Sequence, residues 1–163
     1  MAIVQLDKIL AGASGNMEHV LVYSDTAKTE LLEDYTNGIF VVAEELVEGN
    51  REAKKARLAQ GADKDILLVH SPELMYDEKK KLRDFVNAKG SISRAYRLAL
   101  GDIITVTVGL LPEVSVGDSI TVKDGKFATS EGTESLLFKV IEDAGNELDI
   151  TEKAYALQVV QNG

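Results

Sequence analysis

The sequence contains no cysteine and only two histidines. Without cysteine there is no disulfide framework, no thiolate metal site and no cysteine nucleophile. Transition-metal sites usually need His or Cys ligands at short spacings, and His19 and His70 lie far apart in the chain. We therefore expect no metal site and no cofactor.

Motifs for catalysis and for phosphate binding are also missing. A serine nucleophile needs a base that a third group orients, and Ser14 lies in Ala-Ser-Gly without the Gly-x-Ser-x-Gly pattern. Neither common glycine-rich phosphate loop occurs, and the acidic segment 143–149 lacks the ligand order of an EF-hand loop. We predict that the chain is not an enzyme and has no catalytic residues, and that His19 and His70 are structural or surface residues.

The charge balance argues against nucleic acid as a partner. Asp and Glu number 27 against 18 Lys and Arg, which gives a formal net charge of -9. Binding to phosphate backbones depends on an excess of basic residues. There is no apolar run of the roughly 20 residues that a membrane helix needs, and the first residues lack the basic and apolar regions of a signal peptide. We expect neither nucleic acid nor membrane as a partner, and synthesis in the cytoplasm.

The strongest positive signal is a series of short alternating segments in the second half of the chain. In the segment 103–108, Ile104, Val106 and Val108 would lie on one face of a strand. Asp124-Gly125 separates two such runs, as the two-residue turn of a β-hairpin would. The predicted strands are 94–100, 103–108, 119–122, 126–129, 136–142 and 154–160. The pattern predicts a mainly β fold of the α+β type, a small antiparallel barrel or sandwich with one or two short helices.

The first half of the chain is less uniform. Residues 18–23, 39–42 and 65–71 are apolar, β-branched runs and are predicted strands. Residues 51–60 are good helix formers but give only a thin apolar stripe, so helix and strand remain equally open. A short helix is predicted within 76–87, ahead of Gly90.

The N-terminus is predicted to be separate from the rest. Residues 1–16 comprise an arm and a glycine-rich link, followed by a β-rich domain at 17–163 with a potential subdivision near 88–93. An arm at residues 2–10 could add a strand to a neighbouring subunit through Ile3, Val4 and Leu6. The same segment could equally be the first strand of the barrel.

A second candidate contact is the apolar cluster Leu74, Met75 and Tyr76, which lies in a polar connection after Pro72. Three large apolar residues in such a loop either anchor it to its own barrel, which we favour, or dock a neighbouring molecule. These three residues and Ile3, Val4 and Leu6 are the predicted interaction residues.

Several short sequence motifs, in a fixed order along the chain, also resemble those of a known protein family. They are Asn37-Gly38, Glu48–Glu52, Ser71–Asp77, Phe85–Asn87, Arg94–Leu98 and Gly101–Ile103. Over most of residues 37–160 the chain resembles small structural proteins encoded in the head modules of tailed bacteriophages, of the capsid accessory or decoration type. The resemblance implies a non-enzymatic virion protein that binds in many copies to the major capsid protein or other virion proteins, with contacts between its own copies.

The residues alone leave a second class open. A small β-barrel can also serve as an intracellular adaptor or ligand-binding protein, with a pocket formed by the loops at one end of the sheet.

Overall fold

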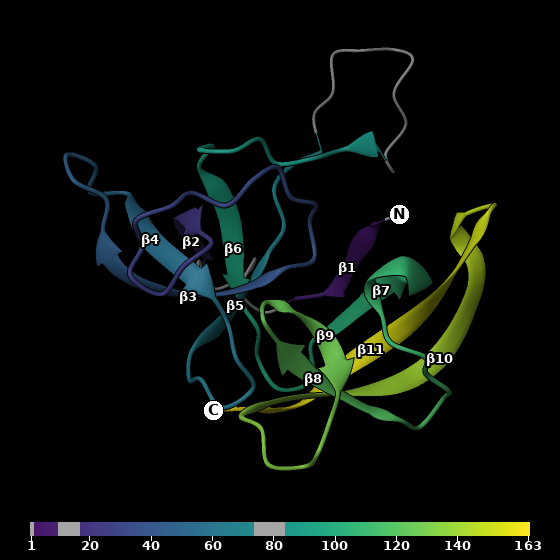
Figure 1. Cartoon of the computed structure of the whole chain (residues 1–163). Coiled ribbons are helices and arrows are strands. Elements are labelled where there is room, and N and C mark those ends of the chain that lie inside the picture. The colour runs from purple at the N-terminus through teal and green to yellow at the C-terminus, as the bar shows by residue number, and fades with distance from the viewer. Residues whose placement is uncertain (1, 10–16, 74–83) are drawn as a thin grey trace.

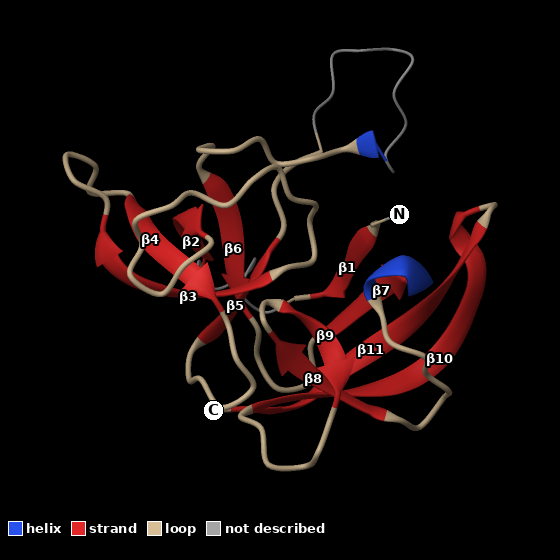
Figure 2. Cartoon of the chain, viewed as in Figure 1, coloured by secondary structure: helices blue, strands red, loops and turns tan. Residues whose placement is uncertain are grey.

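The computed structural model describes residues 2–9, 17–73 and 84–163 (Figure 1). The described chain is mainly β, as predicted, and Figure 2 shows almost all of its regular structure as strands. The strands are β1 (Val4–Lys8), β2 (Met17–Tyr23), β3 (Phe40–Leu46), β4 (Ala53–Leu58), β5 (Ile66–Val69), β6 (Ser93–Arg97), β7 (Ile103–Thr107), β8 (Ser119–Lys123), β9 (Lys126–Thr129), β10 (Leu136–Asp149) and β11 (Glu152–Asn162). A 3-10 helix, η2 (Val108–Leu110), follows β7.

The strands form two units. One is a closed barrel in the order β2-β4-β3-β5-β6, in which β2 and β4 are parallel. The other is a six-stranded antiparallel sheet in the order β1-β7-β11-β10-β8-β9. The chain leaves the sheet after β1, forms the barrel with β2 to β6, and returns to the sheet between Arg97 and Ile103. The subdivision near 88–93 stays a prediction.

The continuous apolar runs of β3 and β5 are explained by burial on both faces. Successive side chains of a strand point to opposite sides. Phe40, Ile66 and Leu68 accordingly join a core shared with the sheet, whereas Val41 and Leu67 pack inside the barrel. Strands between two apolar layers lose the usual polar alternation.

The shared core is centred on three phenylalanines, one from the barrel and two from the sheet. The ring centroid of Phe40 lies 4.9 Å from that of Phe127 and 5.8 Å from that of Phe138. The two sheet rings are 5.7 Å apart. Tilted and edge-on arrangements at these distances are favourable for aromatic rings, so the two units pack as one body.

Backbone hydrogen bonds join the same two units beside this core. The amide of Phe40 donates to the carbonyl of Gly125, and the amide of Gly125 donates to the carbonyl of Ala59, both at 2.8 Å. The amide of Ser135 donates to the carbonyl of Gly61, also at 2.8 Å. The connection between β4 and β5 is therefore bonded to two turns of the sheet.

The predicted hairpin at Asp124-Gly125 is confirmed. Lys123 pairs with Lys126, and the two turn residues have φ values of 51° and 73°. Two successive positive φ angles are typical of the type I′ turn, which matches the twist of the flanking strands.

Two segments that the sequence left open now have a structure. Residues 53–58 form strand β4, because pairing with β2 and β3 outweighs the helix propensity of their charged side chains. Residues 4–8 form edge strand β1, which pairs with β7 of the same chain. Most of the helix expected at 76–87 lies outside the described residues, and Asn87 forms a bridge with Tyr35. No helix among the described residues has the length and apolar character of a membrane span.

We predict that Gly125→Val destabilises the protein more than Gly49→Val does. Both glycines have positive φ, at +73° and +76°, so both substitutions carry the backbone strain. A Cβ at Gly125 would lie 2.7 Å from Leu58 Cδ2, whereas nothing lies within 4 Å at Gly49. We expect Gly125→Val to lower the free energy of unfolding by about 1–3 kcal/mol more than the control, measured as a melting temperature several degrees lower. Equal melting temperatures would contradict the tight packing of this turn.

Candidate functional site

A groove of about 430 Å³ lies between edge strand β1 and the barrel. It is lined by residues from four parts of the chain: Ile3, Val4, Gln5 and Leu6 from the N-terminal segment, His70, Pro72 and Glu73 after β5, Arg94 and Tyr96 from β6, and Leu148 from β10. The predicted interaction residues Ile3, Val4 and Leu6 thus lie together on one wall. Leu74, Met75 and Tyr76 lie outside the described residues, so their role stays a prediction.

The wall formed by β1 presents backbone groups to the groove. The carbonyl of Ile3 accepts a hydrogen bond from the amide of Thr107 on β7. Backbone groups alternate in direction along an antiparallel strand, so those of Val4 and Leu6 point away from β7. The Val4 carbonyl accordingly bonds to Nε2 of His70 at 2.9 Å. The groove therefore runs along the outer edge of β1.

The side chains of this wall differ in how deeply they are buried in the shared core. Ile3 and Val4 are only 3% and 2% exposed, and Val4 belongs to the shared core. Leu6 is half-buried and packs against the same core. Contact with a partner through Ile3 or Val4 as a free arm would require β1 to leave the sheet, whereas contact along the groove would not.

Strand β6 forms the opposite wall. Ala95 packs inside the barrel, so its neighbours Arg94 and Tyr96 point outward into the groove. The Tyr96 ring lies edge-on to the His70 ring, with centroids 6.4 Å apart. Arg97, the next basic residue, forms an ion pair with Asp65, whereas Arg94 has no ion-pair partner within the described ranges. Arg94 thus leaves a positive charge at the groove.

Buried amide side chains fix the segments beside the groove. The Asn37 side chain donates to the Ser71 carbonyl at 3.0 Å and accepts from the Ser71 amide at 2.9 Å. Asn87 Nδ2 donates to Asn37 Oδ1 at 3.1 Å. Nearby, the Tyr35 hydroxyl contacts Ser93 Oγ at 2.5 Å, and burial raises the pKa of Tyr35. These satisfied polar groups hold the chain on both sides of residues 72–86.

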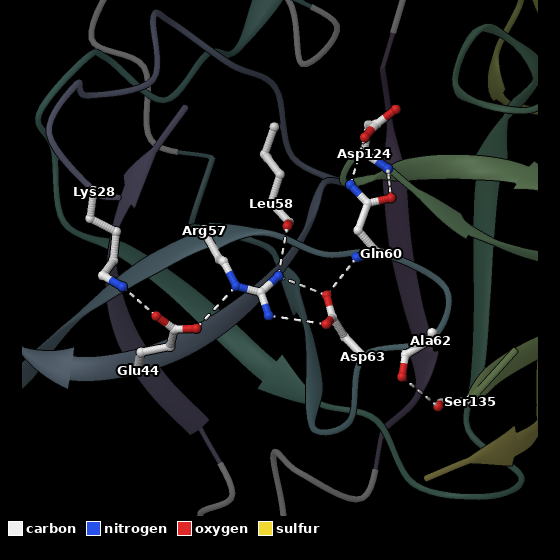
Figure 3. A network of polar contacts seen from close by, with 9 residues as sticks. All are labelled: Lys28, Glu44, Arg57, Leu58, Gln60, Ala62, Asp63, Asp124 and Ser135. Atoms are coloured by element: carbon white, nitrogen blue, oxygen red, sulfur yellow. Dashed lines mark hydrogen bonds and ion pairs between the residues drawn. The ribbon is translucent and has the colours of Figure 1, made fainter. Parts of the chain in front are cut away.

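A second polar cluster joins the barrel to the β8–β9 hairpin (Figure 3). The Arg57 guanidinium donates to both carboxylate oxygens of Asp63, at 2.8 and 3.0 Å, and to Glu44 at 3.0 Å. Lys28 also pairs with Glu44. Gln60 reaches the hairpin by donating to Asp124 Oδ1 at 2.6 Å. The charges in this cluster are paired, which is typical of a structural network rather than a reactive site.

The pKa shifts in this cluster follow from its ion pairs. The hydrogen bond from Arg57 holds the pKa of Asp63 below its usual value, although partial burial opposes the shift. Lys28 and then Arg57 lower the pKa of Glu44 in the same way. Each carboxylate is therefore kept ionised well into the acidic range.

The chemistry of the two histidines is limited by their surroundings. Nε2 of His70 is engaged by a carbonyl oxygen rather than by a hydroxyl nucleophile. His19 is exposed on β2. Nowhere in residues 2–9, 17–73 and 84–163 do three or more His, Asp or Glu side chains gather as potential metal ligands. The groove is a surface suited to binding, with apolar walls, the outer edge of β1, and an arginine that has no ion-pair partner among the described residues.

Comparisons with known proteins find no similar protein. No protein-family model matches the chain, and neither a curated protein nor a solved structure matches it. The function must therefore be argued from the groove and the surface around it.

Sequence reasoning missed Arg94, Tyr96 and Leu148 as parts of this site. The spacing of Arg94 and Tyr96 places them on one face of a strand, which the sequence could have indicated. That this face meets β1 depends on the pairing of segments far apart in the chain, and no local pattern carries that information.

We predict that Val4→Ala lowers the free energy of unfolding by about 1–3 kcal/mol, because Val4 is buried in the shared core. Gln5→Ala, at an exposed neighbouring position, is the control and should change stability by less than about 0.5 kcal/mol. Urea unfolding of the purified protein measures both. If Val4→Ala were as stable as the wild type, residues 4–8 would be an arm that contributes nothing to the isolated chain.

We also predict that Asp63→Asn lowers the melting temperature at pH 7 and that the difference from wild type shrinks in acid. Because the folded pKa of Asp63 is lowered, its contribution is fully present above the ordinary pKa of about 3.9. It is lost as the pH falls through the lower folded value. Melting curves from pH 7 to pH 2.5 test this, with the exposed Glu113→Gln as control. A difference that stays constant over this range would show that the ionised carboxylate does not stabilise the fold.

Proposed function

We propose that the protein is a non-enzymatic structural protein of a tailed bacteriophage, made in the host cytoplasm and bound in multiple copies to the capsid surface, which it reinforces or decorates. The observation that carries the proposal is the long β10–β11 hairpin. Figure 1 shows it reaching away from the rest of the molecule. The resemblance of residues 37–160 to head-module proteins supplies the capsid as the partner.

The hairpin is longer than the fold requires. β8 pairs with β10 only at Phe138 and Lys139, and β7 pairs with β11 from Ala154 to Gln158. Only residues 146–153, beyond the Gly145–Ala154 pair, extend past the paired part of β7, and within them the Glu152 carboxylate accepts a hydrogen bond from the Gly109 amide of η2 at 2.6 Å. At the turn, Ile150 is 89% exposed. Turn positions usually carry Gly, Asn, Asp or Pro, and the almost fully exposed Ile150 side chain at the tip of this hairpin is available for contact with another protein.

The rest of the molecule suits a role in a shell. The shared core and the backbone bonds between the units hold the hairpin in a fixed orientation relative to the body. A rigid body repeats the same contact in every copy, and many weak contacts then add through symmetry. The net charge of -9 gives the protein little affinity for packaged DNA, which favours a position on the outside of the shell.

The groove supports a second candidate, an intracellular adaptor or ligand-binding barrel. The barrel interior is filled by side chains such as Val20, Val22 and Leu67, so a ligand would have to bind outside it. The groove beside β1 has the volume of a small-molecule site and combines apolar walls with polar groups. This candidate needs no capsid.

Co-sedimentation with purified capsids that lack this protein tests the proposal. We expect saturable binding of many copies per particle. Ile150→Ser should reduce the occupancy at subsaturating concentration, whereas Leu100→Ser, which removes an apolar residue 71% exposed in another turn, should not. The absence of binding, together with a stabilising hit in a small-molecule thermal-shift screen, would support the ligand-binding alternative and overturn the capsid proposal.

A further inference from the structure

The turn of the β10–β11 hairpin is built around an exposed apolar side chain. Asp149 pairs with Glu152, which leaves Ile150 and Thr151 as the turn. Asp149 Oδ1 accepts hydrogen bonds from the Thr151 amide at 2.8 Å and the Thr151 hydroxyl at 2.6 Å. The Ile150 carbonyl also accepts a hydrogen bond from Asn146 Nδ2 at 3.3 Å. The Ile150 side chain takes no part in these bonds and is left in solvent.

The groove beside β1 has the properties of a receptor for such a side chain. Ile3, Leu6, Tyr96 and Leu148 give it apolar walls. The outer backbone edge of β1 offers hydrogen-bonding groups to an extended segment. The volume of about 430 Å³ exceeds that of a single isoleucine side chain and leaves room for neighbouring residues of the hairpin.

The acidic turn is complementary in charge to Arg94 of the groove, whose lining also contains Glu73. Glu147 and Asp149 lie on either side of Leu148 near the hairpin turn and make it acidic. Arg94 lies in the groove and has no ion-pair partner in the described part of the chain. In a chain of net charge -9, a contact between copies needs such a local cation to offset the general repulsion.

The position of the turn relative to the groove determines which symmetry an assembly of two copies could have. Leu148 lines the groove of its own chain, and Ile150 lies two residues further along. The projecting residue and its receptor are therefore neighbours on one face of the molecule. When both lie close to a two-fold axis, each copy can reach the other, and the contact closes as a dimer instead of propagating as a filament.

We propose that two copies of this chain form a two-fold dimer in which Ile150 of each copy enters the groove of the other, with Glu147 facing Arg94 across the interface. This contact deepens the proposed function, because it names a second copy as the partner of the hairpin. It is tested in solution without capsids, so the two proposals can fail separately. A monomer that binds capsids through Ile150 would refute the dimer alone, and a dimer that does not bind capsids would refute the capsid role alone.

Sedimentation equilibrium of the purified full chain measures the dimer directly. We expect a concentration-dependent dimer whose Kd rises at least about tenfold with Ile150→Ser, since a truncated apolar anchor at an interface commonly has an effect of this size. Leu100→Ser is the matched control and should leave the Kd unchanged. A wild-type protein that stays monomeric up to about 100 μM, or an Ile150→Ser variant with an unchanged Kd, would overturn the proposal.

Charge reversal tests the pairing across the interface. Arg94→Glu and Glu147→Arg should each weaken the dimer, because each places like charges opposite one another. The double variant, and an equimolar mixture of the two single variants, should recover dimer formation. Circular dichroism and melting curves check that the variants are folded, and Arg94→Gln serves in place of Arg94→Glu if that variant is not. Failure of recovery with folded variants would refute the Glu147–Arg94 contact.

Discussion

The structure depends on the burial of β3 and β5 between two cores. Phe40, Ile66 and Leu68 pack against the sheet, while Val41 and Leu67 fill the barrel. A shift of one residue in either strand would turn each apolar layer towards the wrong partner. Because the two units share this layer, the barrel cannot rotate against the sheet without opening the core. The groove lies between β1 of the sheet and β6 of the barrel, so the shared core also fixes the width of the groove.

The polar contacts between the units have a different role from the core. The bonds between Phe40, Ala59 and Gly125 satisfy backbone groups that the junction would otherwise bury unpaired, which would carry a large energetic penalty. The ion pairs around Arg57 are partly exposed, and such pairs stabilise proteins only modestly. The core therefore holds the units together, and the polar contacts select one relative orientation. Gly125 belongs to both systems, because its positive φ forms the turn and its missing side chain lets Leu58 and Phe40 approach.

The sequence predicted those elements whose burial follows a local pattern. β7, β8, β9 and the turn at Asp124-Gly125 lie within a residue of their expected places, because one face of each strand is buried and the alternation is visible. β10 continues to Asp149, well past the predicted end at 142, because its outer half is exposed and carries charges instead of an alternating pattern. β4 was undecided for a related reason, since Lys54 and Arg57 point outward and pair with Glu18 and Asp63. Of the residues that line the groove, the sequence singled out Ile3, Val4 and Leu6 as predicted contacts, whereas Arg94 and Leu148 come together with them only through long-range pairing.

In the outer half of the β10–β11 hairpin, packing in a core does not determine which residues occur. Elsewhere, the buried apolar side chains belong to the two cores, while a few others, such as Leu100 and Val116, are exposed in turns. At the turn, Ile150 contributes to neither core, and the turn is already fixed by Asp149 and Thr151. A polar residue is the more usual choice at such a turn, because an exposed apolar tip on a projecting hairpin favours association. The same hairpin places Leu148 in the lining of the groove that contains Arg94, for which the described part of the chain provides no ion-pair partner. The hairpin thus presents an apolar side chain beside the groove, while the net negative charge makes copies of the chain repel one another at long range. The proposed association is therefore short-ranged and specific to one orientation.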